Sequence, residues 1–241
     1  YRLAQPTPLI DAAKIREQLS AQQNQRIANL QFDFETGSTQ LNAQQRSAPE
    51  QGIDVWLAEC QTAGLERQGK TWQSPPLSNI YCSINRRFPC AISDLSGFSL
   101  AVAVMLAESL QIFCSGKLQL KWPNDIWLAG KKCAGLLIQI RGEAGGPCDV
   151  TIGFGVNVRM SAHAGRQIDQ SWTSLAEHSC LPLNRNALLA KILDDMLNGF
   201  ELYQQQGLPA FIERWRALDG LLGQPVTLAL GASNINGIAR G

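Results

Sequence analysis

Two short motifs bring a carboxylate, an amide and a lysine close together. Residues 121–125 read Lys-Trp-Pro-Asn-Asp and follow an expected strand. Proline cannot continue the hydrogen-bonded ladder of a strand, so Asn124 and Asp125 fall in a turn, where a carboxylate can face a ligand or Mg²⁺. After a tight turn at residues 129–130 come Lys131 and Lys132, and a lysine on this returning strand is expected near that carboxylate. A site that binds charged ligands and an ordinary surface hairpin both fit this pattern.

Residues 64–71 match the phosphate-binding pattern of P-loop NTPases. They read Gly-Leu-Glu-Arg-Gln-Gly-Lys-Thr and follow an expected strand. In that class a helix begins at the Gly-Lys-Thr, so that its N-terminal amides face the phosphates. Pro75 and Pro76 would break such a helix, at about 3 kcal/mol or more each. The sequence therefore favours a loop that covers an anionic ligand with Arg67 and Lys70, or a solvated loop, and a P-loop NTPase is the weaker alternative.

Taken in order along the chain, these and other motifs resemble the biotin protein ligase family in its bacterial, BirA-type form. The strongest blocks are Lys-Trp-Pro-Asn-Asp, Lys-x-Ala-Gly at 132–135 and Gly-Phe-Gly-Val-Asn at 153–157. Weaker support comes from Ser-Thr at 38–39, Ala-Glu-Cys-Gln-Thr-Ala-Gly at 58–64 and Trp-x-Ser-Pro at 72–75. The likeness runs through nearly the whole chain, and the order and spacing of the blocks make chance agreement remote.

The resemblance implies a reaction in two steps. The carboxylate of biotin attacks the α-phosphorus of ATP, and a lysine of an acceptor protein then attacks the biotinyl-adenylate. ATP, Mg²⁺ and biotin are the implied ligands, and the biotin carboxyl carrier domain of acetyl-CoA carboxylase is the implied acceptor. A lipoate-protein ligase of the same broad fold is the alternative, because fold alone does not decide the substrate.

The resemblance also implies roles for individual residues. Lys132 matches the family's catalytic lysine, whose ammonium would offset the charge that develops between the biotin carboxylate and the α-phosphate. Arg67 matches a residue that clamps the adenylate, Trp72 would face the adenine, and Asp125 would hold the metal ion. The residues implied in biotin binding are Ser38, Thr39, Gln40, Gln61, Gly64, Leu65, Glu66, Arg67 and Lys132. Those implied in ATP binding are Arg67, Trp72, Asn124, Asp125, Lys132 and Asn157.

The signature loop departs from the family's pattern. The family has Gly-Arg-Gly-Arg-x-Gly-Arg, whereas this chain has Leu65, Glu66 and Lys70 at three of those positions, and Gln40 replaces the asparagine that usually follows Ser-Thr. Unless it points outward, Glu66 places an anion beside an anion-binding site. A like charge at about 4 Å costs about 1 kcal/mol in water and about 4 kcal/mol at an effective dielectric constant near 20. We therefore expect weaker retention of the adenylate than in relatives, and slower adenylate release from Glu66→Gly.

Hydrophobic periodicity predicts the elements that position these residues. Strands are expected at residues 30–34, 55–60, 79–84, 117–122, 133–140 and 150–158. Helices are expected at residues 11–22, after Ser38 and Thr39, and at 93–114, 186–206 and 209–218. Consecutive strands with short turns favour an α+β fold with a mixed, mostly antiparallel sheet and helices packed on one side. The resemblance implies that this fold is similar to the class II aminoacyl-tRNA synthetases.

The resemblance divides the chain into modules. Residues 1–14 resemble the linker that follows an N-terminal helix-turn-helix, and residues 15–219 form the catalytic domain. Residues 220–241 contain a single hairpin that would be only marginally stable alone, so they are expected to begin a small β module. The resemblance implies that this module is SH3-like. Binding to DNA and biotin-responsive repression are therefore expected only of a full-length protein that carries the helix-turn-helix. A homodimer joined edge to edge through the sheet also fits the resemblance.

Composition further limits the classes of protein to which the chain can belong. A formal net charge of +1 over 241 residues gives no whole-protein field that would attract nucleic acid or an anionic membrane. Seven cysteines without a C-x-x-C pair indicate reduced thiols and a cytoplasmic protein. The two histidines lack ligand-like spacing, which argues against a zinc site. The most apolar stretch, residues 98–106, is far shorter than the roughly 20 residues of a membrane span.

Overall fold

A single large sheet organises the chain, whose computed structural model describes residues 8–143, 145–230 and 233–241. The sheet has seven strands in the order β1-β2-β3-β7-β6-β5-β4. β1 runs parallel to β2, and the other neighbouring pairs in this sheet are antiparallel. The strands are β1 (Ile27–Thr36), β2 (Ile53–Gln61), β3 (Ile80–Phe88), β4 (Leu118–Lys121), β5 (Asp125–Leu128), β6 (Lys131–Gly142) and β7 (Cys148–Val156). The expected α+β class and mostly antiparallel sheet are confirmed.

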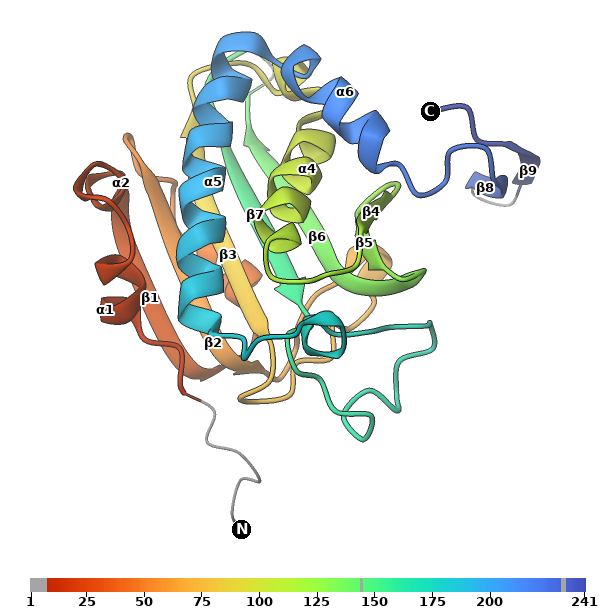
Figure 1. Ribbon diagram of the computed structural model, residues 1–241. Coiled ribbons are helices and arrows are strands. Elements are labelled where there is room, and N and C mark those ends of the chain that lie inside the picture. Colours follow the sequence, from red (N-terminus) through yellow and green to blue (C-terminus); the bar gives the residue numbers. More distant parts are fainter. Residues whose placement is uncertain (1–7, 144, 231–232) are drawn as a thin grey trace.

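The main helices cover one face of this sheet (Figure 1). They are α1 (Ala12–Glu17), α2 (Ala21–Gln25), α4 (Phe98–Gln111), α5 (Arg185–Gln206) and α6 (Pro209–Leu218). Between the helices and the sheet, Phe88 meets Phe98 at a ring-centroid distance of 5.1 Å and Phe200 at 6.3 Å. These rings are fully buried, and burial of such side chains is the main force that holds the two layers together.

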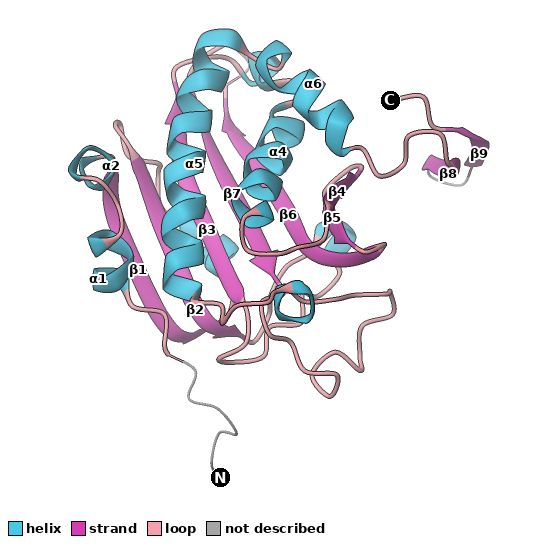
Figure 2. Ribbon diagram, in the orientation of Figure 1, coloured by secondary structure: helices cyan, strands magenta, loops and turns pink. Residues whose placement is uncertain are grey.

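A short helix, α3 (Thr39–Gln44), lies on the other face of the sheet (Figure 2). Side chains alternate between the two faces of a strand, and on β3 the apolar Cys82 and Ile84 join the core under the large helices. The intervening Ser83 and Asn85 face α3, where the Asn85 amide donates to the carbonyl oxygen of Ala43 at 3.2 Å. Polar residues thus mark the α3 face, which carries the functional site.

Several expected boundaries were wrong. The helix expected at 11–22 is interrupted because the Ser20 hydroxyl caps α2, accepting from the Gln23 amide at 3.1 Å. The helix expected at 93–114 begins only at Phe98, because Gly97 has a left-handed φ of 77°. β5 was not expected as a separate strand. It pairs with both β4 and β6, which completes a four-strand meander with β7.

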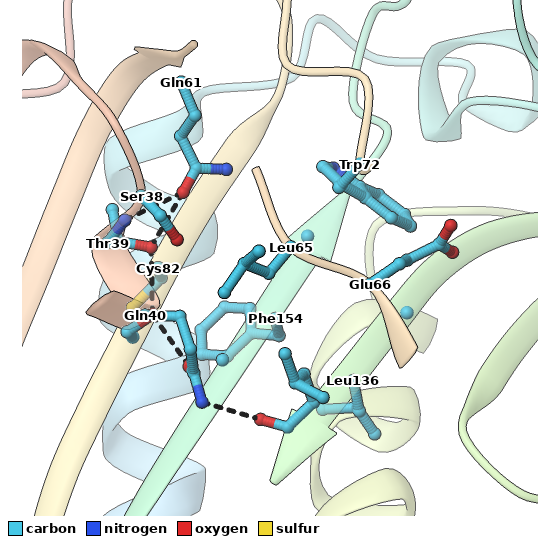
Figure 3. Close-up of a pocket in the computed structure, with 15 residues that line it drawn as sticks. Ser38, Thr39, Gln40, Gln61, Leu65, Glu66, Trp72, Cys82, Leu136 and Phe154 are labelled. Carbon is cyan, nitrogen blue, oxygen red and sulfur yellow. Dashed lines mark hydrogen bonds between the residues drawn. The ribbon is translucent and has the colours of Figure 1, made fainter. Parts of the chain in front are cut away.

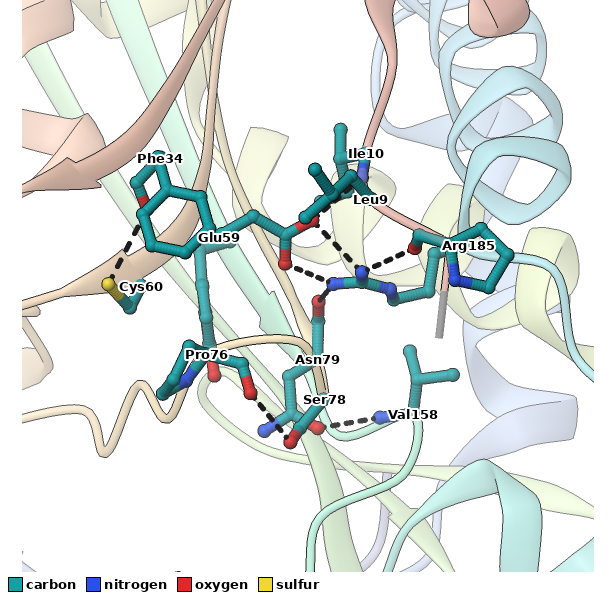
Figure 4. A network of polar contacts seen from close by, with 12 residues as sticks. Leu9, Ile10, Phe34, Glu59, Cys60, Pro76, Ser78, Asn79, Val158 and Arg185 are labelled. Atoms are coloured by element: carbon teal, nitrogen blue, oxygen red, sulfur yellow. Dashed lines mark hydrogen bonds and ion pairs between the residues drawn. The ribbon is translucent and has the colours of Figure 1, made fainter. Parts of the chain in front are cut away.

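The N-terminal segment is held by a buried ion pair (Figure 4). Arg185, at the start of α5, meets both carboxylate oxygens of Glu59 on β2, at 2.7 and 3.0 Å. The same guanidinium donates to the carbonyl oxygens of Asn79, at 3.1 Å, and Pro8, at 2.8 Å. The Glu59 carboxylate also accepts from the amide of Ile10 at 2.7 Å. Two charged side chains therefore join β2, α5 and the entry of the chain.

The C-terminal hairpin extends past α6 (Figure 1). It consists of β8 (Pro225–Leu230) and β9 (Ser233–Ile238), which pair with each other in a sheet of their own. Its exposed apolar side chains include Leu228, Ile235 and Ile238. The SH3-like module stays a prediction, and residues 1–7 of the expected linker lie outside the described residues. Within the described residues, no helix is both long and apolar enough to cross a membrane.

Candidate active site

A pocket lies on the α3 face of the sheet, between α3, the central strands and the loop that follows β2 (Figure 3). Six of the nine residues predicted to bind biotin meet here from distant parts of the chain, whereas Gly64, Arg67 and Lys132 do not line this pocket. Those that line the pocket are Ser38, Thr39, Gln40, Gln61, Leu65 and Glu66, and Trp72 lines it with them. Sequence reasoning did not select Ser83, Leu136 or Phe154, which also line it. The alternating pattern of a strand does not identify such residues, because the neighbouring sequence does not distinguish a position that faces the site from any other.

One end of the pocket is a polar network. The Gln61 side-chain oxygen accepts from the Thr39 amide at 2.9 Å and from its hydroxyl at 3.1 Å. The Gln61 amide nitrogen donates to Ser74 Oγ at 3.0 Å, and Thr39 Oγ1 lies 2.9 Å from Ser83 Oγ. Ser38 Oγ is buried without a hydrogen-bond partner among the described residues. A buried polar atom without a partner is costly, so this end of the pocket suits a polar ligand group.

Gln40 forms part of the pocket floor. Its side chain is 3% exposed, donates to Gln139 Oε1 at 2.8 Å and accepts from Ser83 Oγ at 3.3 Å. The amide oxygen fits because Gly153 has no side chain, since a Cβ there would lie 2.3 Å from it. The substitution of glutamine for asparagine did not disturb the helix start, because α3 begins at Thr39 with Ser38 as its N-cap residue.

Residues 64–71, which match the P-loop pattern, form a closed hairpin rather than a P-loop. Leu65 and Thr71 form an isolated antiparallel bridge, and the Glu66 amide donates to the Lys70 carbonyl oxygen at 2.8 Å. Gly64 closes the base by accepting from the Trp72 amide at 2.9 Å, and it is buried where a Cβ would lie 2.7 Å from the Trp72 carbonyl oxygen. Residues 71–75 are not helical. The helix that a P-loop NTPase needs is therefore missing from this described segment.

Lys132 is buried beside two carboxylates. Its ammonium lies 3.0 Å from Asp125 Oδ1 and also pairs with the carboxylate of Glu66. The side chain is 6% exposed, and the ammonium lies 5.1 Å from the centroid of the Trp72 ring. The prediction that a lysine of this strand lies near Asp125 is confirmed, and that lysine is Lys132. Of the two orientations left open for Glu66, the inward one is observed.

Trp72 lies across the strands opposite Lys132. A Cβ on Gly155 would be 2.4 Å from the indole, and a Cβ on Gly135 would be 3.0 Å from it. A glycine on each of these two strands thus makes room for the ring. The indole Nε1 is buried and has no hydrogen-bond partner among the described residues. The ring therefore forms a wall of the pocket and is packed against β7.

Gly155→Ala is expected to displace Trp72 and to lower the free energy of unfolding by about 1–3 kcal/mol, the usual cost of an overpacked site. Urea denaturation measures this change. Gly237→Ala is the matched control, because a Cβ at Gly237 meets nothing within 4 Å. Equal stability of the two variants would show that the indole is not held against β7.

Two wider clefts adjoin the pocket, and Lys132 lines both. One, of about 490 Å³, includes Lys70, Trp72 and Asn157. The other, of about 870 Å³, includes Arg67, Asn124 and Asp125. All six predicted ATP-binding residues thus line one or both clefts. The segment at residues 167–172 also lines the smaller cleft and was missed, because it has no motif and no regular periodicity.

Some of these residues also hold the backbone together. The Asn124 amide donates to the Leu136 carbonyl oxygen at 3.0 Å, which fixes the turn at the start of β5. The Asn157 amide donates to the Thr173 carbonyl oxygen at 3.1 Å, and Asn157 is 3% exposed. Arg67 is exposed at the tip of the hairpin. Asn124 and Asn157 therefore have structural partners already, whereas Arg67 is free to turn toward a ligand.

Buried thiols under the site are expected to resist alkylation. Burial raises the pKa of Cys82 well above its usual range and also raises the pKa of Cys133. The thiolate is the reactive form, so at pH 8 these residues should remain unmodified by iodoacetamide while the exposed Cys180 reacts. Peptide mass mapping reads the result, with the urea-unfolded chain as the control in which every cysteine is alkylated. Rapid native labelling of Cys82 would contradict the structure.

The chain is similar to known proteins in sequence and in fold. Residues 32–157 match the biotin/lipoate A/B protein ligase family. The bifunctional ligase/repressor BirA of Salmonella typhimurium is 34% identical over 241 residues, covering 100% of this chain and 73% of that protein. The biotin–[acetyl-CoA-carboxylase] ligase of Mycobacterium tuberculosis is 29% identical, covering 97% of this chain and 86% of that protein. A solved structure, the biotin protein ligase of Aquifex aeolicus in complex with biotin and ATP, superposes with a TM-score of 0.71 at 24% identity, covering 88% and 86% of the chains.

The fold is that of a protein ligase, with helices on one face of a mixed sheet and the pocket on the other. The chain belongs to the biotin/lipoate A/B protein ligase family. Its curated relatives in these comparisons are ligases, and the chain is an enzyme of that class.

Proposed function

We propose that the chain activates biotin with ATP and transfers the biotinyl group to a lysine of an acceptor protein. The observation that carries the proposal is the position of Lys132. Its ammonium lies beside the inner pocket, against Glu66 and Trp72, and also lines both outer clefts. A carboxylate from the pocket and a phosphate from a cleft can therefore meet at one buried cation.

The inner pocket suits biotin. Its polar end, at Ser38, Thr39 and Gln61, matches the polar ureido group, and the unpartnered Ser38 hydroxyl is available to it. Leu136 and Phe154 supply apolar contacts along the pocket, as is usual for small-molecule sites. The substrate's carboxylate would then point toward Lys132.

The chemistry follows from that arrangement. A carboxylate oxygen of biotin attacks the α-phosphorus, the new oxygen–phosphorus bond forms, and the bond to pyrophosphate breaks. The Lys132 ammonium offsets repulsion between the two anions and the charge that develops during attack. In the second step the acceptor amine attacks the acyl carbon, AMP departs, and the amine's proton passes to solvent.

Mg²⁺ is proposed to arrive with the nucleotide and to use Asp125. Mg²⁺ in nucleotide sites commonly takes only one or two protein carboxylates and completes its shell with phosphates and water. The described residues fit that mode, because they include no group of three or more His, Cys, Asp or Glu side chains able to hold a metal alone. Asp125 lines the larger cleft, as this role requires.

Incubation with ATP, Mg²⁺, an acceptor domain and either biotin or lipoate tests the proposal. We expect the acceptor's mass to increase by a biotinyl group, and only when ATP is present. Modification by lipoate alone would assign the chain to the other branch of the family. No modification with either acid would overturn the proposal.

The names of two relatives support further proposals on partners. One is named for acetyl-CoA carboxylase, so we propose its biotin carrier domain as the acceptor. The other is also named a repressor, and we propose that role, with DNA binding, for a protein that carries an N-terminal helix-turn-helix. The edge strand β1, with Phe34 55% exposed, is the surface we propose for a homodimer. Analytical ultracentrifugation with and without biotin and ATP tests the dimer.

A further inference from the structure

The hairpin after β2 places two neighbouring side chains in the site. Backbone hydrogen bonds close it on both sides, at 2.8 Å between Glu66 and Lys70 and at 2.9 Å between Trp72 and Gly64. Leu65 consequently lies in the inner pocket, between its polar end and Phe154, and Glu66 lies farther along, toward Trp72 (Figure 3). With Leu65 in place the pocket has a cavity volume of only about 30 Å³.

Glu66 meets the cation that the substrate needs. Its carboxylate pairs with the Lys132 ammonium, and Asp125 Oδ1 lies 3.0 Å from the same nitrogen. The three charged side chains are at most 17% exposed, so water screens them poorly. One ammonium is already shared between two carboxylates. A third carboxylate must therefore displace one of them or bear the repulsion of both.

We propose that Leu65 and Glu66 form an internal stand-in for the substrate. Leu65 takes the volume of biotin's apolar chain, and Glu66 takes the place of its carboxylate on Lys132. An apolar group followed by a carboxylate has the chemical pattern of biotin itself, here supplied by the chain. The inference rests on the proposed function, because it assigns the inner pocket to biotin.

The stand-in has a consequence for ligand selectivity. Biotin must break the Glu66–Lys132 pair to place its carboxylate, so part of its binding free energy is used for displacement. A biotin analogue without the carboxylate must also displace Leu65, but it does not compete with Glu66 for the Lys132 ammonium. The native chain should therefore discriminate poorly between biotin and biotinol, in which a primary alcohol replaces the carboxylate.

Isothermal titration of the 241-residue chain with biotin and with biotinol tests the inference. Glu66→Gln keeps the side chain's shape and removes its charge, so biotin affinity should rise at least about tenfold while biotinol affinity stays near the native value. Glu66→Ala removes the same carboxylate and should give the same contrast. Glu17→Gln, an exposed position on α1, is the matched control and should change neither affinity.

The outcomes separate the two proposals. If Glu66→Gln leaves both affinities unchanged, or changes them equally, the stand-in is overturned while biotin binding by the native chain keeps the proposed function. If neither the native chain nor the variants bind biotin, the proposed function and the stand-in both fail.

Discussion

Replacing Lys132 with glutamine is expected to lower the rate of biotin-dependent pyrophosphate release by about 10²- to 10³-fold. That range is typical for loss of one preorganised group that stabilises charge in the transition state. The reason here is geometric, because the Lys132 ammonium is buried where the pocket and both clefts meet. Glutamine can donate a hydrogen bond but brings no positive charge. The measurement is pyrophosphate release at saturating biotin and ATP.

Lys131→Gln is the matched control. Lys131 precedes Lys132 on β6 and is exposed, so its removal should leave the rate unchanged. Lys132→Gln also leaves Glu66 and Asp125 without their shared cation, so thermal unfolding of each variant must accompany the assay. If folded Lys132→Gln is as active as Lys131→Gln, the assigned role of Lys132 is wrong.

Arg185→Met is expected to lower the free energy of unfolding by about 3–5 kcal/mol, because it leaves the Glu59 carboxylate buried without its partner. Glu59 is 0% exposed, and Arg185 is 5% exposed. The substitution also removes donors from the carbonyl oxygens of Asn79 and Pro8 (Figure 4). Urea denaturation followed by circular dichroism measures the loss.

Arg214→Met provides the comparison for this prediction. Arg214 pairs with Glu108 across α4 and α6, but its side chain is 38% exposed and that of Glu108 is 41% exposed. Exposed pairs contribute about 0–1 kcal/mol, so a small effect is expected. The double variant Glu59→Gln with Arg185→Met should recover part of the loss, since no charge remains buried. Equal losses for Arg185→Met and Arg214→Met would contradict the structural role.

The parts of the fold that the sequence predicted are those with long, regular patterns. The period of apolar residues located α5 to within a residue, at 185–206 against the expected 186–206. β5 was not predicted as a separate strand because it has only four residues and follows Pro123. The break before Phe98 depends on the left-handed φ of Gly97, where a Cβ would also clash with Leu208. Contacts between distant residues of this kind are invisible to local periodicity.

The candidate site was likewise predicted only in part. The motifs predicted that a lysine lies near Asp125, because a strand, a tight turn and a returning strand fix their separation, and the resemblance selected Lys132. The direction of Glu66 was left open, since it depends on how a hairpin far along the chain packs against β6. The contribution of residues 167–172 was missed for the same reason, because irregular backbone reaches the cleft only through tertiary packing.

Trp72 is placed where its fluorescence depends on the position of the hairpin after β2. The chain has six tryptophans, and one of the others, Trp56, is 3% exposed and lies on β2. Trp72 instead packs against Gly135 on β6 and Gly155 on β7, and its ring lies near the buried Lys132 ammonium. Trp72 belongs to the same hairpin as Glu66. Any displacement of that hairpin changes both the polarity and the charge around the indole. A ligand that displaces the hairpin should therefore change the fluorescence emission of Trp72.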